Sequence, residues 1–110
     1  MILSKKIANE IAEEAMELQD YGTLCSTGYY VVYENLRKNI CCSVDICKEK
    51  DNDREWFALY IAYDGTDDEG NDIQGDMDFT SKLDKDELAE RLLTIAQDAK
   101  TEFGNKGKAA

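Results

Sequence analysis

The order of hydrophobic periodicities along the chain limits the possible folds most strongly. Apolar residues recur at helical spacing near both ends of the chain, and they alternate with polar residues in four segments between those ends. This order favours an α+β fold, in which strands that follow each other in sequence pair as antiparallel hairpins. We therefore predict the order α-β-β-β-β-α, a four-stranded antiparallel sheet with both helices packed on one face.

The first predicted helix has a clear start signal. Ser4 is a good N-cap, because its hydroxyl can accept a hydrogen bond from a free backbone N–H of the first turn. Apolar residues then recur at helical spacing from Ile7 through Ile11 to Leu18. Gly22 follows, and we predict that it ends the helix.

The second predicted helix begins with a capping-box pattern. Asp84 is followed three residues later by Glu87. The Asp84 carboxylate can accept a hydrogen bond from the Glu87 backbone N–H, and the Glu87 carboxylate can accept one from the Asp84 backbone N–H. An apolar series at helical spacing then runs to Phe103, and Gly104 follows it. The pattern predicts a helix over 85–103.

Four segments between the helices have the composition and alternation of strands. They are residues 29–33, 40–47, 56–63 and 73–80. The turn at residues 35–39 matches no preferred two-residue turn, so the register of the first hairpin stays open.

The last two strands predict a hairpin with a defined register. We expect these opposite pairs on its apolar face: Tyr63 and Ile73, Ile61 and Gly75, Leu59 and Met77, Phe57 and Phe79. On the other, open face, Tyr60 would then lie opposite Asp76 and Ala58 opposite Asp78, with Trp56 close by. Carboxylates and aromatic rings would share one accessible face.

Size and composition indicate one domain over residues 1–110, with 1–3 and 105–110 expected to be frayed. Of the 110 residues, 43% are hydrophobic, which is enough for one core without disulfides or metals. The sequence shows no signal-peptide pattern and no apolar run long enough for a membrane span, so we expect a cytoplasmic protein. In that compartment the four cysteines should be reduced thiols.

Negative charge is concentrated in one part of the chain. Between Asp64 and Glu90 there are eleven carboxylates and only two lysines, which gives −9 of the total net charge of −11. Such a segment repels nucleic acid and membrane phosphates and attracts basic protein surfaces. We therefore expect a basic protein as the partner, without direct nucleic-acid or membrane binding, and a monomer or homodimer.

The leading functional hypothesis is a non-enzymatic binding protein that occludes a basic surface of its partner. Aromatic rings would add burial and cation–π contacts, and carboxylates would accept charge-assisted hydrogen bonds. The expected partner-binding residues are Trp56, Tyr60, Asp64, Asp67, Asp68, Glu69, Asp72, Asp76 and Asp78.

In general character the chain resembles the small antagonists that phages and mobile elements encode. It is short, acidic, without histidine, and has no catalytic motif. Anti-restriction and anti-CRISPR proteins of this kind often mimic DNA. The resemblance implies an inhibitor whose spaced carboxylates imitate a phosphate row and occupy the channel of a nucleic-acid-binding or defence protein.

A structural or assembly module is the alternative from another class. In that interpretation the open sheet face pairs with a second copy or another subunit, and the acidity only provides solubility. We expect no enzyme activity and no cofactor, because histidine and Gly-rich phosphate loops are absent.

Metal and redox interpretations are weaker alternatives. The EF-hand spacing fails around Gly70, because Gly65 stands where the first ligand should be. A looser calcium site would use these residues: Asp64, Asp67, Asp68 and Asp72. The spacing of Cys25, Cys41, Cys42 and Cys47 differs from that of zinc knuckles. We expect Cys42 in the core, and Cys41 and Cys47 as exposed thiols on the opposite face of the same strand.

Overall fold

The computed structural model describes residues 3–104 and confirms the predicted order of elements. The elements are α1 (Lys5–Met16), β1 (Ser26–Asn35), β2 (Ile40–Lys50), β3 (Glu55–Asp64), β4 (Asp76–Phe79) and α2 (Lys85–Phe103). The four strands form one open antiparallel sheet in the order β1-β2-β3-β4. Within residues 3–104, neither helix is long and apolar enough to cross a membrane.

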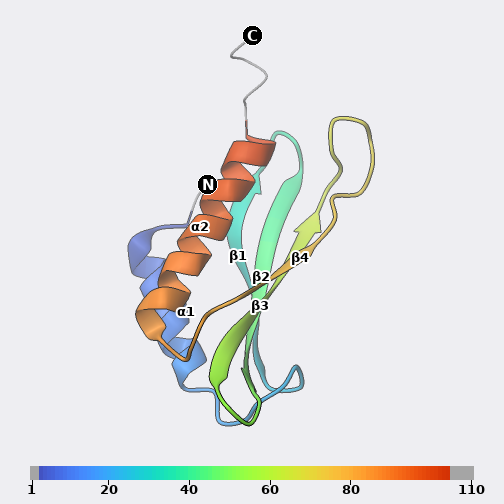
Figure 1. Ribbon diagram of the computed structural model, residues 1–110. Helices are drawn as coiled ribbons and strands as arrows, with labels where there is room; N and C mark the ends of the chain where they lie inside the picture. The colour runs from blue at the N-terminus through green and yellow to red at the C-terminus, as the bar shows by residue number, and fades with distance from the viewer. Residues whose placement is uncertain (1–2, 105–110) are drawn as a thin grey trace.

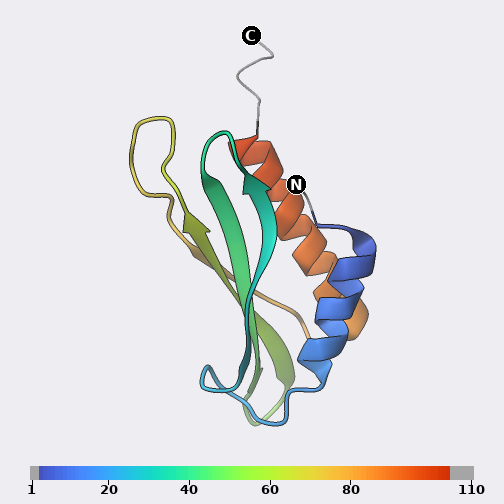
Figure 2. The ribbon, with the colours of Figure 1, turned by 180° about the vertical axis from the view of Figure 1, so that it is seen from behind.

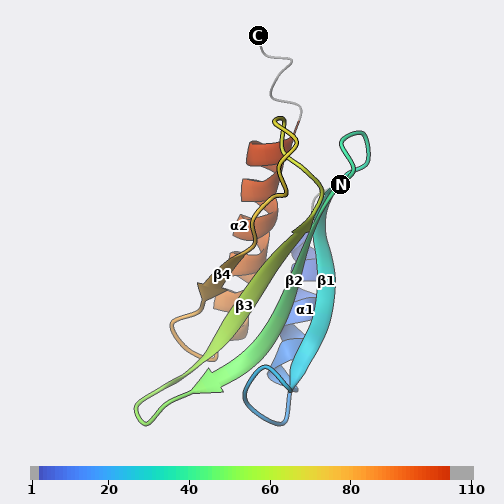
Figure 3. The same cartoon turned by 90° about the vertical axis from the view of Figure 1, so that its right-hand side faces the viewer.

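Both helices lie on the same face of the sheet, as predicted (Figures 1 and 2). The other face, which we call the open face, carries no helix and is turned toward the viewer in Figure 3. The core lies between the helices and the sheet. Its fully buried side chains include Val44, Ile46, Phe57, Leu59, Leu88 and Leu92.

The start of α1 is as predicted, but its end is not. The Ser4 hydroxyl accepts a hydrogen bond from the Ile7 backbone N–H at 3.2 Å. The helix ends at Met16, six residues before the predicted stop at Gly22. Lys48 explains the early end, because its ammonium group donates hydrogen bonds to the carbonyls of Met16 and Leu18 and so replaces the helical bonds those carbonyls would otherwise accept.

At the start of α2 only half of the capping box forms. The Asp84 carboxylate accepts hydrogen bonds from the backbone N–H groups of Asp86 and Glu87. The Glu87 carboxylate does not return to Asp84 and instead accepts from the backbone and hydroxyl of Ser81, both at 2.7 Å. These bonds, with some help from Arg91, hold the pKa of Glu87 below its usual value.

The register predicted for the β3–β4 hairpin is wrong by one residue. The observed pairs are Ala58 with Phe79, Leu59 with Asp78, Tyr60 with Met77, and Ile61 with Asp76. Asp76 and Asp78 therefore lie on the helix side of the sheet, and Met77 and Phe79 lie on the open face.

Two contacts explain the observed register. Asp78 pairs with Arg91 of α2 at 3.1 Å, which requires the Asp78 side chain to point toward the helices. Thr80 is buried, and its hydroxyl accepts a hydrogen bond from the Phe57 backbone N–H at 2.9 Å. Both contacts depend on residues far away in sequence.

The first hairpin, whose register the sequence left open, pairs Asn35 with Ile40 and Tyr30 with Val44. Its turn contains Asn39 at φ 54°, a left-handed conformation that Asn tolerates. A bulge after Val31 shifts the alternation, so the neighbouring residues 32 and 33 are both buried.

The ends of the chain were expected to be frayed. Residues 1–2 and 105–110 lie outside the described residues, so for them this stays a prediction. Leu3 is only 7% exposed and packs in the hydrophobic core.

Candidate protein-binding surface

The long loop between β3 and β4 is held by its own hydrogen bonds. Thr66 and Asp72 form an isolated β-bridge. Inside it, the Asp67 carboxylate accepts hydrogen bonds from the backbone N–H groups of Glu69 and Asn71, both at 2.9 Å. The backbone N–H of Asp67 also donates to the Asn71 carbonyl. The loop thus presents its acidic side chains from a defined backbone.

We call the carboxylates of this loop the acidic tip: Asp64, Asp67, Asp68, Glu69 and Asp72. All ion pairs among residues 3–104 involve other carboxylates, namely Glu13, Asp78, Asp84 and Glu87. The acidic tip therefore has no ion pair within the described part of the chain. This property is the one expected of a surface that attracts a basic partner.

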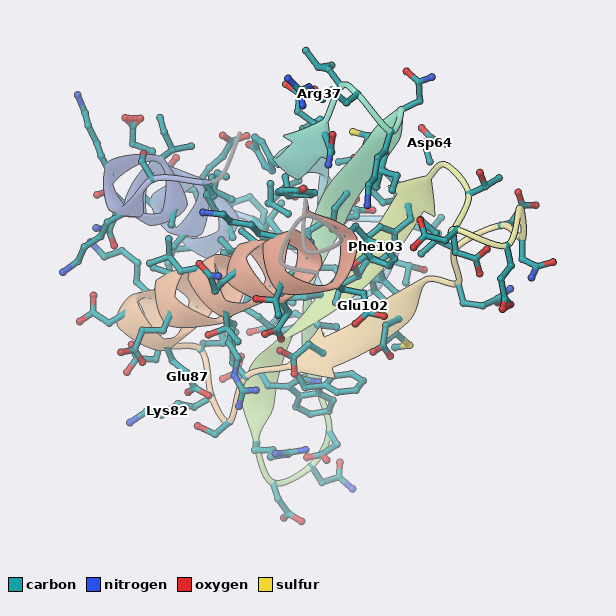
Figure 4. All side chains as sticks on the ribbon, turned by 90° about the horizontal axis from the view of Figure 1, so that it is seen from above. Arg37, Asp64, Lys82, Glu87, Glu102 and Phe103 are labelled. Carbon is teal, nitrogen blue, oxygen red and sulfur yellow. The ribbon has the colours of Figure 1, made fainter. Side chains whose placement is uncertain are left out.

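The tip lies at the same end of the molecule as the β1–β2 turn and the end of α2 (Figure 1). A pocket of about 300 Å³ lies between these three segments, and Lys38, Glu102 and Phe103 contribute to its wall together with the tip. Figure 4 looks down on this end and labels Asp64, Glu102 and Phe103 there. Lys38 donates a hydrogen bond to the Gly104 carbonyl and brings one positive charge to this pocket.

Trp56 and Tyr60 lie on the open face and are half-buried. Each belongs to a row that crosses the sheet, as the strand register shows. The rows are Val31–Ser43–Ala62, Tyr29–Asp45–Tyr60–Met77, Ser26–Cys47–Ala58–Phe79 and Glu49–Trp56. The guanidinium of Arg54 lies 4.6 Å from the centre of the Trp56 ring and covers part of it.

Four apolar side chains of the open face, among them Val31 at 43% exposure, were not predicted from the sequence. Tyr29 is 61% exposed, Met77 46% and Phe79 44%. For Met77 and Phe79 the cause is the one-residue register error. Arg91 on α2 is a sequence signal that favours the observed register, because a carboxylate on the side of β4 facing the helices can pair with it.

The predicted set of binding residues is therefore divided between two surfaces. Trp56 and Tyr60 lie on the open face, and the acidic tip lies beyond the end of the sheet. Asp76 and Asp78 lie on the helix side of the sheet, where Asp78 pairs with Arg91, so neither residue belongs to these two surfaces. Asp64 is the last residue of β3, opposite Cys41, and it is where the acidic tip meets the open face.

Two buried polar atoms on the open face are left without partners. Among residues 3–104, Asp45 Oδ1 and Trp56 Nε1 are the buried side-chain nitrogen or oxygen atoms for which no hydrogen bond forms. Such groups are costly and uncommon in folded proteins, and they call for a specific explanation.

The cysteines are all free thiols, and Cys41 and Cys47 are less exposed than predicted. Cys42 is buried in the core, as predicted. Cys47 points to the open face, but it is fully buried there rather than exposed. Burial raises the pKa of the Cys42 thiol to about 11, and burial together with Glu49 raises that of Cys47 to about 12. Cys41 is half-buried.

The residues weighed for a calcium or zinc site do not converge. Within residues 3–104, no three Cys, Asp or Glu side chains are placed to hold a metal ion together. In the loop, the Asp67 carboxylate is used instead to cap backbone N–H groups.

The described residues thus define an α+β protein with an acidic tip and an apolar open sheet face. No protein-family model, curated protein or solved structure gave a significant match to this chain.

Proposed function

We propose that this chain is a non-enzymatic binding protein that occludes a basic surface of a partner. The observation that carries the proposal is the acidic tip, whose five carboxylates are held on an ordered loop and have no ion pair among residues 3–104. Fixed charge without such pairs steers a basic partner and gives it charge-assisted hydrogen bonds without a large ordering cost.

The partner class that fits best is a nucleic-acid-binding protein, whose basic channel the tip would fill in place of phosphates. The net charge of −11 supports this choice, because it opposes binding to nucleic acid itself. The proposal makes the chain an inhibitor of the phage or mobile-element type and places it in the cytoplasm. The four free thiols are consistent with that compartment.

The test uses oligolysine as the probe and calorimetry over a series of salt concentrations. The loop variant carries Asp68→Asn, Glu69→Gln and Asp72→Asn, and it keeps Asp67 because that carboxylate caps the loop. The control variant removes three exposed carboxylates elsewhere: Glu10→Gln, Asp20→Asn and Glu90→Gln. Both variants have the same net charge.

We expect the loop variant to bind oligolysine about tenfold more weakly than the control variant, with a smaller dependence on salt. The original protein should also displace a fluorescent DNA duplex from oligolysine, and the loop variant should do so poorly. Equal losses in the two variants would show that only total charge matters and would overturn the proposal.

Self-association through the open face is the second candidate function. The exposed side chains on the open face favour it, because burying them against a second copy removes apolar surface from water. They are Tyr29, Val31, Met77 and Phe79. Sedimentation with Phe79→Asp tests it. A dimer that is insensitive to salt and lost in this variant supports the assembly function, and a monomer at all concentrations contradicts it.

A further inference from the structure

A hollow of about 410 Å³ lies on the open face beside Asp64. The residues that line it are Tyr29, Ser43, Ala62, Tyr63 and Asp64. Its floor is low because Ser43 and Ala62, which pair across β2 and β3, are small. The strand pairs of β4 with β3 stop at Asp76 and Ile61, and Gly75 lies close against Ile61 just before them. The low floor of the hollow is thus a consequence of the small residues of β2 and β3.

The walls of the hollow combine an aromatic ring with a carboxylate. Tyr29 is 61% exposed, so most of its ring is available for contact. Asp64 is exposed and belongs to the acidic tip, which has no ion pair among residues 3–104. An aromatic ring and a methyl group suit the apolar stem of a long basic side chain, and a carboxylate suits its charged end.

A further carboxylate, that of Asp45, lies near the hollow on the same face. Asp45 lies between Tyr29 and Tyr60 in its row, two residues from Ser43 in the floor of the hollow. Its buried Oδ1 atom forms no hydrogen bond within residues 3–104. That atom is shielded from solvent, so a donor seated in the hollow would not reach it, but the Asp45 carboxylate adds to the negative potential around the hollow.

Charge also argues against a second copy as the occupant of the hollow. A second copy would bring another chain of net charge −11 against this acidic face. Like charges that face each other across an interface repel and oppose binding. A basic partner gains from the same carboxylates.

We propose that this hollow receives a lysine or arginine side chain of the basic partner, with its stem against Tyr29 and Ala62 and its charged end at Asp64. The inference rests on the proposed function and adds where the partner is anchored. It joins the acidic tip and the open face into one continuous binding surface, with Asp64 at the junction.

The experiment titrates acetyl-arginine amide into the isotope-labelled protein and follows backbone amide signals by NMR. Acetyl-citrulline amide, which has nearly the same shape without the charge, is the ligand control. Asp64→Asn is compared with Asp53→Asn, an exposed carboxylate in the turn between β2 and β3. Tyr29→Leu is compared with Tyr29→Phe, which keeps the ring.

We expect saturable shifts at Ser43 and Ala62 with the arginine probe and none with the citrulline probe. Asp64→Asn should raise the dissociation constant about threefold, the size expected of an accessible ion pair, and Asp53→Asn should leave it unchanged. Tyr29→Leu should weaken binding, and Tyr29→Phe should not.

Shifts confined to the acidic tip, or equal effects of Asp64→Asn and Asp53→Asn, would overturn the hollow as the anchor. That result would leave the proposed function standing, because the oligolysine experiment tests the tip separately. A failure in the oligolysine experiment would instead remove the basic partner itself.

Discussion

The Arg91 guanidinium lies 3.1 Å from the Asp78 carboxylate and joins α2 to the edge strand β4. The same guanidinium approaches Glu87 one helical turn earlier, at 3.7 Å. Glu87 in turn accepts hydrogen bonds from Ser81 in the segment between β4 and α2. Arg91 therefore connects both ends of that segment and fixes which side of β4 faces the helices.

Replacing Arg91 should loosen β4. Arg91→Met keeps the apolar stem and removes both ion pairs, and we expect it to lower the free energy of unfolding by about 1 kcal/mol. Amide exchange at Met77 and Phe79 should become faster. Lys85→Met, which breaks the more exposed pair with Glu13, is the control and should leave β4 exchange unchanged. Unchanged exchange in Arg91→Met would mean that the pair does not hold the strand.

Thr80 should tolerate the loss of its methyl group better than the loss of its hydroxyl. The hydroxyl accepts from the Phe57 backbone N–H and donates to the Lys82 carbonyl at 2.7 Å. Thr80→Val would leave a buried N–H without a partner, and we expect a loss of about 2 kcal/mol in urea denaturation. Thr80→Ser keeps both bonds and should cost about 1 kcal/mol. Equal stability of the two variants would contradict this role of the hydroxyl.

Alkaline pH should destabilise the protein through its buried thiols. The pKa of Cys42 is raised by burial to about 11, and that of Cys47 to about 12, from an ordinary 9.0. Above pH 9 the unfolded chain loses these protons while the folded chain keeps them, so the free energy of unfolding falls as pH rises.

Denaturation between pH 9 and pH 11 measures this loss. Cys47→Ala should reduce the slope of stability against pH, whereas Cys25→Ala at a half-buried thiol serves as the control. If the slope is the same in both variants, the Cys47 thiol does not contribute to it.

Gly65 should be much less replaceable than Gly70 in the β3–β4 loop. It has φ 135°, and a Cβ atom there would lie 2.8 Å from the Asn39 carbonyl oxygen. Gly70 also has positive φ, at 83°, but a Cβ atom there would meet no atom within 4 Å. We expect Gly65→Ala to lower the melting temperature clearly more than Gly70→Ala, which carries only the backbone strain. Equal decreases in melting temperature for the two variants would show that the backbone at Asn39 moves away from the added methyl group without loss of stability.

Local signals in the sequence were enough for the helix starts but not for every helix end. Ser4 and Asp84 cap their helices as predicted, because an N-cap bond joins residues two or three positions apart. The end of α1 depends on Lys48, which lies on β2 and donates to the helix from a distance of about thirty residues in sequence. No local sequence pattern could predict that contact.

In the candidate site, too, some features could be predicted from local sequence and others depend on contacts between distant residues. Its charge could be predicted, because the carboxylates between Asp64 and Asp72 are neighbours in sequence. The composition of the open face could not, because it depends on which side of β4 turns toward the helices.

The sequence by itself determined the order α-β-β-β-β-α, the helix starts and the place of the negative charge. Only the tertiary structure decided the register of β4, and with it the burial of Asp78 against Arg91 and the exposure of Met77 and Phe79. The physical reason is that alternation gives the period of a strand but not its phase. The phase is set by contacts of Thr80 and Arg91 with partners that only folding brings near.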